Sequence, residues 1–221
     1  MIGFVIALQS EAKAFLEKID NLEQIKLADK IAYTGKIDDE DVVVAISGIG
    51  KVSAGLTTQL LIDKFNVDCI FNFGTCGGMN SSVEILKYYA ISQCCQFDFD
   101  LRALDPVPLG YIQEYKTAHF NCETKDIDLP ISKVASADRF TDDIEDINDI
   151  NSMGCSLRDM EGGAIGQVCT SNNVKLYMIK GVTDVYGSQT AQEQFYKNLT
   201  SVCNGFPEIV INAVKNIIKN K

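Results

Sequence analysis

The chain has 221 residues, of which 46% are hydrophobic and 23% are charged, and its formal net charge is −10. This composition is near the globular average, which excludes a disordered chain, a collagen and a coiled-coil rod. The acidic excess disfavours a nucleic-acid partner, because nucleic-acid binding relies on a positive surface. The length predicts a single domain over residues 1–221.

The first residues show no targeting or membrane segment. The apolar run at residues 1–8 has no basic stretch before it and is too short for a signal peptide or a membrane span. Eight cysteines occur without a CxxC pattern, two of them adjacent at Cys94 and Cys95, and His119 is the single histidine, expected on the surface or in a loop. We therefore expect a cytoplasmic protein with reduced thiols, no membrane partner and no metal site.

Apolar runs alternate with helical periodicities along the chain, which indicates an α/β sheet covered on both faces. In the first third of the chain, the patterns predict a buried strand at 1–8, a helix capped by Ser10 and ending near 19, and a hairpin of strands 31–37 and 41–46. A helix at 51–65, with Val52, Leu56, Leu60 and Leu61 on one face, a strand at 67–73, an extended segment at 83–96 and a loop at 105–108 follow. The last part is predicted to hold a strand at 133–136, a helix at 142–150, a segment at 156–160 entering a helix at 161–171, a strand at 175–183, and a helix at 191–221 broken at 205–207.

The glycine-rich segment at residues 47–53 looks like a phosphate-binding loop but lacks the residues that such a loop needs. A Walker A loop requires a glycine where this chain has Ala45, and Ser or Thr where it has Val52. The dinucleotide fingerprint requires Gly or Ala at position 53, which is Ser53. We therefore expect a turn between strand and helix, whose free N–H groups can still face a ligand.

Three acids and a run of glycines follow predicted strands. Glu11 follows the first strand, residues 74–78 follow the strand at 67–73, Glu161 follows the segment at 156–160, and Asp184 follows the strand at 175–183. Ligands of open α/β sheets bind outside the carboxyl ends of the strands. If these strands are parallel, the three carboxylates and the glycine loop converge on one site.

Six segments together resemble a known family. They are residues 2–11 (IGFVIALQSE), 47–52 (SGIGKV), 72–78 (NFGTCGG), 136–140 (SADRF), 159–165 (DMEGGAI) and 183–185 (TDV). In this order and spacing they resemble the nucleoside phosphorylase and nucleosidase superfamily, and most closely its methylthioadenosine/S-adenosylhomocysteine nucleosidase branch. The resemblance implies a three-layer α/β/α sandwich with a central mixed, partly barrel-like sheet, a homodimer, and no metal or organic cofactor.

The resemblance also implies roles for individual residues. Glu11 takes the place of the glutamate that activates water, and Asp184 that of the aspartate that protonates N7 of the purine. Met160 and Glu161 occupy the ribose positions, and Phe140 stacks on or beside the base. The remaining expected substrate contacts are Ile49, Thr75, Cys76, Gly77 and Thr183.

This assignment agrees with the chemistry of N-ribosyl cleavage. The departing purine needs a proton from a carboxylic acid, which Asp184 supplies only if its site keeps it protonated. A second, ionised carboxylate on the opposite side activates water, as in inverting glycosidases. Phosphate as the nucleophile would need arginines and N–H donors, but Asn72 and the segment at residues 9–11 stand where phosphorylases carry arginines. Hydrolysis is therefore favoured over phosphorolysis.

Several departures from the family pattern leave the preferred nucleoside open. Thr183 replaces a serine, residues 75–76 replace Ser-Ala, and the loop at 105–108 is atypical. Arg102 is expected to form a structural ion pair, although with Leu104 it could contact the 5′ group of the substrate. The expected activity is hydrolysis of a purine nucleoside, such as 5′-methylthioadenosine or S-adenosylhomocysteine, to adenine and a 5′-substituted ribose. A nucleoside phosphorylase and a non-catalytic nucleoside-binding protein remain the alternatives.

Overall fold

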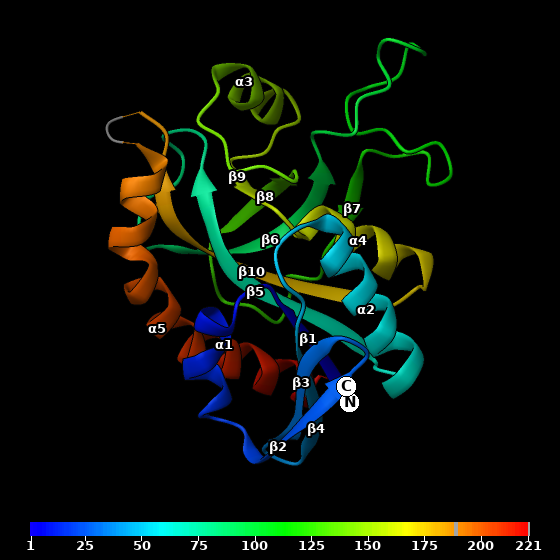
Figure 1. Ribbon diagram of the computed structural model, residues 1–221, viewed down its shortest axis with the longest axis vertical. Coiled ribbons are helices and arrows are strands. Elements are labelled where there is room, and N and C mark those ends of the chain that lie inside the picture. Colours follow the sequence, from blue (N-terminus) through cyan, green and yellow to red (C-terminus); the bar gives the residue numbers. More distant parts are fainter. Residues whose placement is uncertain (188–189, 221) are drawn as a thin grey trace.

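The computed structural model describes residues 1–187 and 190–220, whose strands join into one mixed sheet (Figure 1). The strands are β1 (Ile2–Ile6), β2 (Asp20–Leu27), β3 (Lys30–Ile37), β4 (Glu40–Ile46), β5 (Cys69–Gly78), β6 (Tyr88–Gln96), β7 (His119–Asn121), β8 (Ile131–Ser136), β9 (Leu157–Asp159) and β10 (Lys175–Val185). The helices are α1 (Gln9–Leu16), α2 (Lys51–Phe65), α3 (Ile144–Ser152), α4 (Gly162–Ser171) and α5 (Ala191–Lys219). The expected α/β class with a mixed sheet is confirmed.

Four parallel strands form the part of the sheet that positions the site. β1 pairs with β4 and β5, and β5 pairs on its other side with β10. Every residue of β1 is buried, as in a strand covered on both faces. Beyond β4, the antiparallel strands β3 and β2 continue the sheet, and the predicted hairpin of β3 and β4 is confirmed.

The sheet also closes on itself. β10 pairs with β5 and, antiparallel, with β6; β6 pairs with β8, β8 with β9, and β9 returns to β5. This ring of five strands makes part of the sheet a barrel, which differs from a sandwich built on an open central layer. Strand order of this kind depends on pairing between distant segments, so local sequence patterns do not reveal it.

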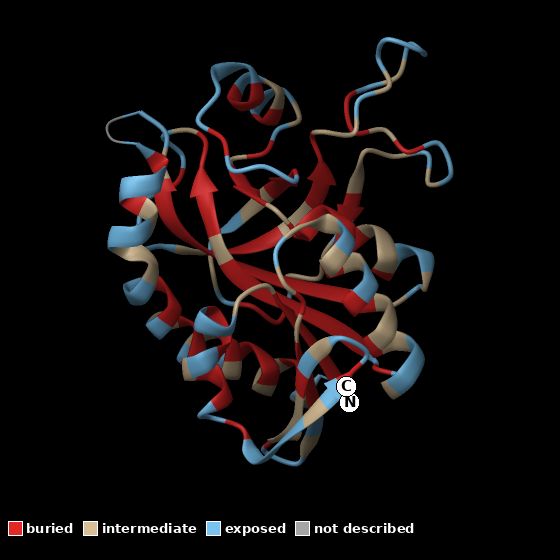
Figure 2. Cartoon of the chain, viewed as in Figure 1, coloured by how far each residue is buried: buried red, intermediate tan, exposed pale blue. Residues whose placement is uncertain are grey.

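Two apolar cores cover the two sides of the sheet, and the central strands between them are buried (Figure 2). In one core, α1 and α5 pack on the strands through aromatic rings, with Phe15 of α1 4.9 Å from Phe4 of β1 between ring centroids. The other core lies under α2 and α4 and includes Leu61 and Ile165. Among the described helices, none is both long enough and apolar enough to cross a membrane.

The face predicted for α2 is only half correct. Leu61 is buried and Leu60 packs against the core, but Val52 is 82% exposed and Leu56 is also exposed. Ala54, Thr57 and Thr58 complete the buried face. The two threonines are compatible with burial because their hydroxyls donate to the main-chain carbonyls of Ser53 and Ala54 four residues earlier. An apolar strip of α2 is therefore left uncovered within the single chain.

The predicted start of α1 also needs correction. The helix begins at Gln9, so Ser10 lies in its first turn and is not the N-cap. The carboxylate of Glu11 accepts the main-chain N–H of Leu8 at 3.2 Å, which is the kind of donor that a capping side chain would otherwise satisfy. The acid of the first helical turn thus replaces the expected cap.

The predicted break in the last helix is wrong as well. α5 continues through Pro207, although Figure 1 shows its two halves running in different directions. Proline inside a helix removes one hydrogen bond and bends the axis without necessarily ending the helix. The last residue of the predicted range, Lys221, lies outside the described residues.

Candidate active site

A cavity of about 670 Å³ opens at the carboxyl ends of β1, β5 and β10. It is lined by Ala7, Leu8, Glu11, Ile49, Asn72, Phe73, Gly74, Thr75, Cys76, Gly77, Phe140, Asp142, Arg158, Asp159, Met160, Glu161, Lys180, Thr183, Asp184, Thr190, Gln192, Phe195 and Tyr196. The expected convergence of the acids and the glycine loop on one site is confirmed.

Ten of the residues predicted as site residues line this cavity: Glu11, Ile49, Thr75, Cys76, Gly77, Phe140, Met160, Glu161, Thr183 and Asp184. Arg102 and Leu104 do not line it within the single chain. Arg102 forms the expected ion pair, because its guanidinium donates to Asp100 at 2.8 Å and lies 3.4 Å from Asp149. Leu104 is 79% exposed.

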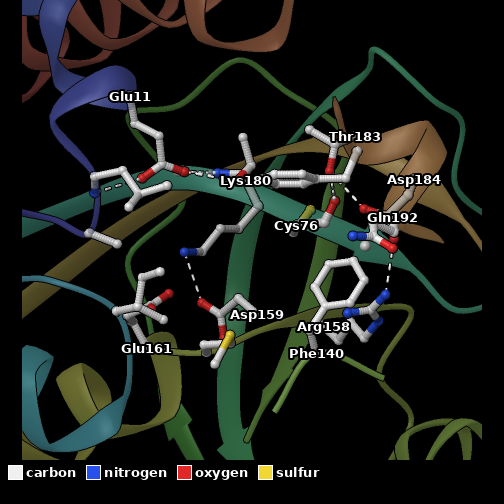
Figure 3. Close-up of a pocket in the computed structure, with 18 of the residues that line it drawn as sticks. Glu11, Cys76, Phe140, Arg158, Asp159, Glu161, Lys180, Thr183, Asp184 and Gln192 are labelled. Atoms are coloured by element: carbon white, nitrogen blue, oxygen red, sulfur yellow. Dashed lines mark hydrogen bonds and ion pairs between the residues drawn. The ribbon is translucent and has the colours of Figure 1, made fainter. Parts of the chain in front are cut away.

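Glu11 lies at one end of the cavity and is fixed by three donors (Figure 3). The N–H and the hydroxyl of Thr75 donate to its Oε1 at 2.7 and 2.8 Å, and the N–H of Leu8 donates to Oε2. Burial raises the pKa of Glu11, while the bonds from Thr75 favour the ionised form and oppose that rise. The side chain is therefore a rigidly held carboxyl group facing the cavity.

A second acidic group lies beside Glu11. Glu161, the residue before α4, accepts the N–H of Gly50 at 2.9 Å. Burial, followed by the neighbouring charge of Asp159, raises the pKa of Glu161 to about 7. Lys180 of β10 is fully buried and pairs with Asp159 at 2.8 Å, so a cation lies among these carboxylates.

Asp184 occupies the other end of the cavity, across from Glu11 (Figure 3). Its Oδ1 accepts the hydroxyl of Thr183 at 2.7 Å, and its Oδ2 accepts a guanidinium N–H of Arg158 at 3.0 Å. Burial raises the pKa of Asp184, while Arg158 and the Thr183 bond lower it and Asp142 raises it further. The net direction is upward, which favours a carboxyl group able to donate a proton.

Strand β5 passes close beneath Asp184 because it carries a glycine there. A Cβ atom at Gly77 would lie 2.7 Å from Oδ2 of Asp184 and 3.0 Å from the guanidinium of Arg158. A side chain at this position would displace the acid. The glycine run expected as a loop after the strand is in fact the end of β5 itself.

Aromatic rings form the rim of the cavity near Asp184. The guanidinium carbon of Arg158 lies 4.4 Å from the centroid of the Phe140 ring, and Phe195 contacts the same ring edge-on. Phe195 and Tyr196 belong to the first turns of α5. Flat apolar surfaces next to a proton donor suit a planar heterocycle.

Sequence reasoning missed Arg158, Asp159 and Lys180 as members of the site. Arg158 and Lys180 are nearly fully buried, which is rare for charged residues unless they are paired. Their partners, Asp184 and Asp159, are 26 and 21 residues away in the sequence, respectively. The one available signal was the presence of a lysine inside the apolar strand at 175–183.

Comparison with known proteins agrees with this geometry. A family model described as the phosphorylase superfamily matches residues 1–215. The chain belongs to the phosphorylase superfamily. A methylthioadenosine/S-adenosylhomocysteine nucleosidase of Staphylococcus saprophyticus is 30% identical to it over 84% of this chain and 86% of the relative, which confirms the predicted branch of the superfamily.

Solved structures of the phosphorylase superfamily share the fold. The nucleosidase of the same type from Colwellia psychrerythraea, solved in complex with adenine, has a TM-score of 0.89 and 26% identity over 97% of this chain and 94% of that one. The futalosine hydrolase of Helicobacter pylori has a TM-score of 0.87 and 25% identity over 100% of this chain and 97% of that one. Both cover nearly all of the chain.

Proposed function

We propose that the chain is a purine nucleosidase that hydrolyses the N-ribosyl bond of 5′-methylthioadenosine or S-adenosylhomocysteine. The products are adenine and the 5′-substituted ribose. The observation that carries this proposal is the pair of buried carboxyl groups, Glu11 and Asp184, at opposite ends of one cavity. A reaction that needs an acid on one side of the scissile bond and a base on the other requires such a pair.

Asp184 is the proton donor to the leaving purine. Burial raises its pKa and so favours the protonated form, and the Thr183 hydroxyl fixes its orientation. Protonation at N7 lets the base leave as a neutral molecule. Phe140 provides the face against which the purine ring stacks.

Glu11 is the base that receives a proton from the attacking water. Thr75 and Leu8 hold its carboxylate in one orientation, so a water molecule bound to it would meet the anomeric carbon from a fixed direction. Glu161 accepts a hydrogen bond from a ribose hydroxyl, and the negative charge of this region stabilises the positive charge that develops on the sugar. Met160 packs beside the ribose.

Water, and not phosphate, is the nucleophile. The region around Glu11 holds Asp159 and Glu161 as well, whereas Lys180 is already paired with Asp159. Phosphate binding requires cationic groups or several N–H donors directed at the anion. Excess negative charge here repels a phosphate ion, which disfavours the phosphorylase alternative.

The working unit that we infer is a cytoplasmic homodimer of one-domain chains. The exposed apolar side chains of Ile49, Val52 and Leu56 form a strip on and beside α2 that suits a second copy. In such a dimer, Leu104 and Arg102 of one copy can reach the 5′ group of the substrate bound to the other copy. Eight free cysteines agree with a reducing compartment.

For the fold we infer the three-layer sandwich of the family, with α1 and α5 on one side and α2 and α4 on the other.

The test is an assay with 5′-methylthioadenosine, with and without phosphate, followed by chromatographic separation of the products. We expect adenine and methylthioribose at the same rate in both conditions. A ribose 1-phosphate product formed only with phosphate would establish the phosphorylase instead. Binding of adenine without any turnover would identify a nucleoside-binding protein.

Replacing Arg158 should change the pH dependence of turnover. Arg158 lowers the pKa of Asp184, so Arg158→Leu removes that effect and the pKa rises. Because Asp184 acts in its protonated form, the alkaline limb of the kcat/KM profile should move to higher pH. Arg158→Lys retains the positive charge and should move the limb less. A limb that stays in place or moves to lower pH in Arg158→Leu would exclude Asp184 as the titrating acid.

A further inference from the structure

Two buried thiols that do not line the cavity lie next to each other. The Sγ atoms of Cys95 in β6 and Cys155, in the segment between α3 and β9, are 3.6 Å apart. Both residues are essentially inaccessible to solvent and belong to a small apolar cluster that includes Ile147 and Ile150 of α3. The two positions are 60 residues apart in the sequence, so no local spacing reveals the pair.

The single histidine completes this group. His119 of β7 is the direct cross-strand neighbour of Cys95 in the antiparallel pairing with β6. A ring nitrogen of His119 and the two sulfurs all lie within 4.8 Å of one another. The Nδ1 atom of His119 is buried and has no hydrogen-bond partner, although buried polar atoms almost always have one.

The donor atoms have the chemistry and spacing of a zinc site. Two sulfurs bound to one tetrahedral zinc ion at about 2.3 Å each lie about 3.8 Å apart, close to the separation of Cys95 and Cys155. The imidazole would move toward the sulfurs until a ring nitrogen lay at its bonding distance of about 2.0 Å from the ion. The main-chain carbonyls of Val134 and Met153 lie 3.8 and 4.0 Å from these sulfurs and offer a fourth ligand, as does water.

Charge decides between zinc and a univalent soft metal. Binding of Zn²⁺ releases the two thiol protons to solvent, and two thiolates with one neutral imidazole then balance the charge of the ion. Cu⁺ with the same ligands would leave a net negative charge in an apolar cluster, which is costly. We propose that Cys95, Cys155 and His119 form a zinc-binding site that joins β6, β7 and the segment preceding β9.

This zinc site is separate from the cavity. None of its three residues lines the cavity, and the two cysteines belong to the apolar cluster that includes Ile147 and Ile150 of α3. Binding therefore stabilises the fold and does not enter the reaction. The bound ion would tie the segment before β9, which leads into Asp159 and Glu161, to the strand beside it.

The experiment uses the full chain, purified reduced and treated with a chelator, and then titrated with Zn²⁺ alone against a chromophoric competitor. We expect one zinc ion per chain and a higher melting temperature with zinc. Co²⁺ should give the thiolate-to-metal charge-transfer absorption of a site with two cysteines. The metal-binding proposal fails if no ion binds at this stoichiometry or if this absorption does not appear.

Variants locate the site. Loss of a residue that hydrogen-bonds to a metal ligand typically costs about 10–100-fold in metal affinity, so loss of a ligand itself in Cys155→Ser or His119→Gln should cost at least about 100-fold. The matched control is Cys122→Ser, because Cys122 and Cys94 form a thiol pair 4.0 Å apart without a histidine. Its zinc affinity should remain unchanged. Equal zinc affinity in Cys155→Ser, or its loss in Cys122→Ser, would overturn the assignment. Unchanged turnover and circular dichroism show that the variants are folded, and the cobalt spectrum of the parent tests the site even where a variant fails to fold.

Discussion

Asp184→Asn is expected to lower the turnover of 5′-methylthioadenosine by at least about a hundredfold, the usual contribution of a general acid. An asparagine fills the same space and its oxygen can still accept the N–H of Arg158, but the amide has no proton to transfer to the purine. Chromatographic measurement of adenine release gives kcat and KM. The loss should fall mainly on kcat, because the stacking surface of Phe140 is unchanged.

The matched control for this variant is Asp142→Asn. Asp142 lines the same cavity and lies 3.9 Å from the same guanidinium. Its side chain is 45% exposed and makes no hydrogen bond to Asp184. We expect its turnover to fall by much less than that of Asp184→Asn. Near-normal turnover in Asp184→Asn, with an intact circular dichroism spectrum, would remove Asp184 from the role of acid.

Glu11→Gln is the second variant with a large expected effect, again at least about a hundredfold in kcat. The glutamine oxygen can keep the two bonds from Thr75, but its NH₂ group then faces the N–H of Leu8, so two donors point at each other. The neutral amide cannot accept a proton from water. Unfolding should become easier by about 1–3 kcal/mol because of these facing donors, which leaves the chain folded.

Glu17→Gln provides the control for the second variant. Glu17 directly follows the same helix, α1, and is exposed, so its replacement tests the loss of a carboxylate near that helix without touching the cavity. Its turnover should equal that of the parent. If Glu11→Gln turned over substrate as fast as Glu17→Gln, another group would have to activate the water.

Site residues at the ends of strands could be predicted from the sequence. Site residues that depend on ion pairs with distant segments could not. Glu11 and Asp184 could be identified because Glu11 follows the apolar strand β1 and Asp184 is the second-last residue of the apolar strand β10, and the carboxyl ends of parallel strands meet at one edge of the sheet. Arg158 and Lys180 become part of the site only through ion pairs with residues on other segments. No periodicity carries that information.

The fold likewise contains features that the local sequence predicts and features that it does not. The bounds of α2 agree with its sequence pattern, but its inward face agrees only in part, because threonines bonded to their own helix are buried while Val52 and Leu56 are exposed. β2 was missed because its sequence, DNLEQIKL, is polar and it lies at the sheet edge. β7 has three residues and depends on β6 for its pairing, so it has no local signal.

Strand β5 lies beside both reacting groups, because its Thr75 binds the carboxylate of Glu11 and its Gly77 pairs with Asp184. Thr75 and Gly77 are two residues apart, which is about 6.6 Å along a strand, and the main-chain hydrogen bonds of β5 maintain this spacing. Carboxyl groups that act from opposite sides of a glycosidic bond with water between them are about 6.5–9.5 Å apart. Side-chain substitutions in the cavity therefore leave this distance nearly unchanged. The same backbone can accept different bases and 5′ groups as its lining residues vary, provided that an acid and a base remain at the two ends.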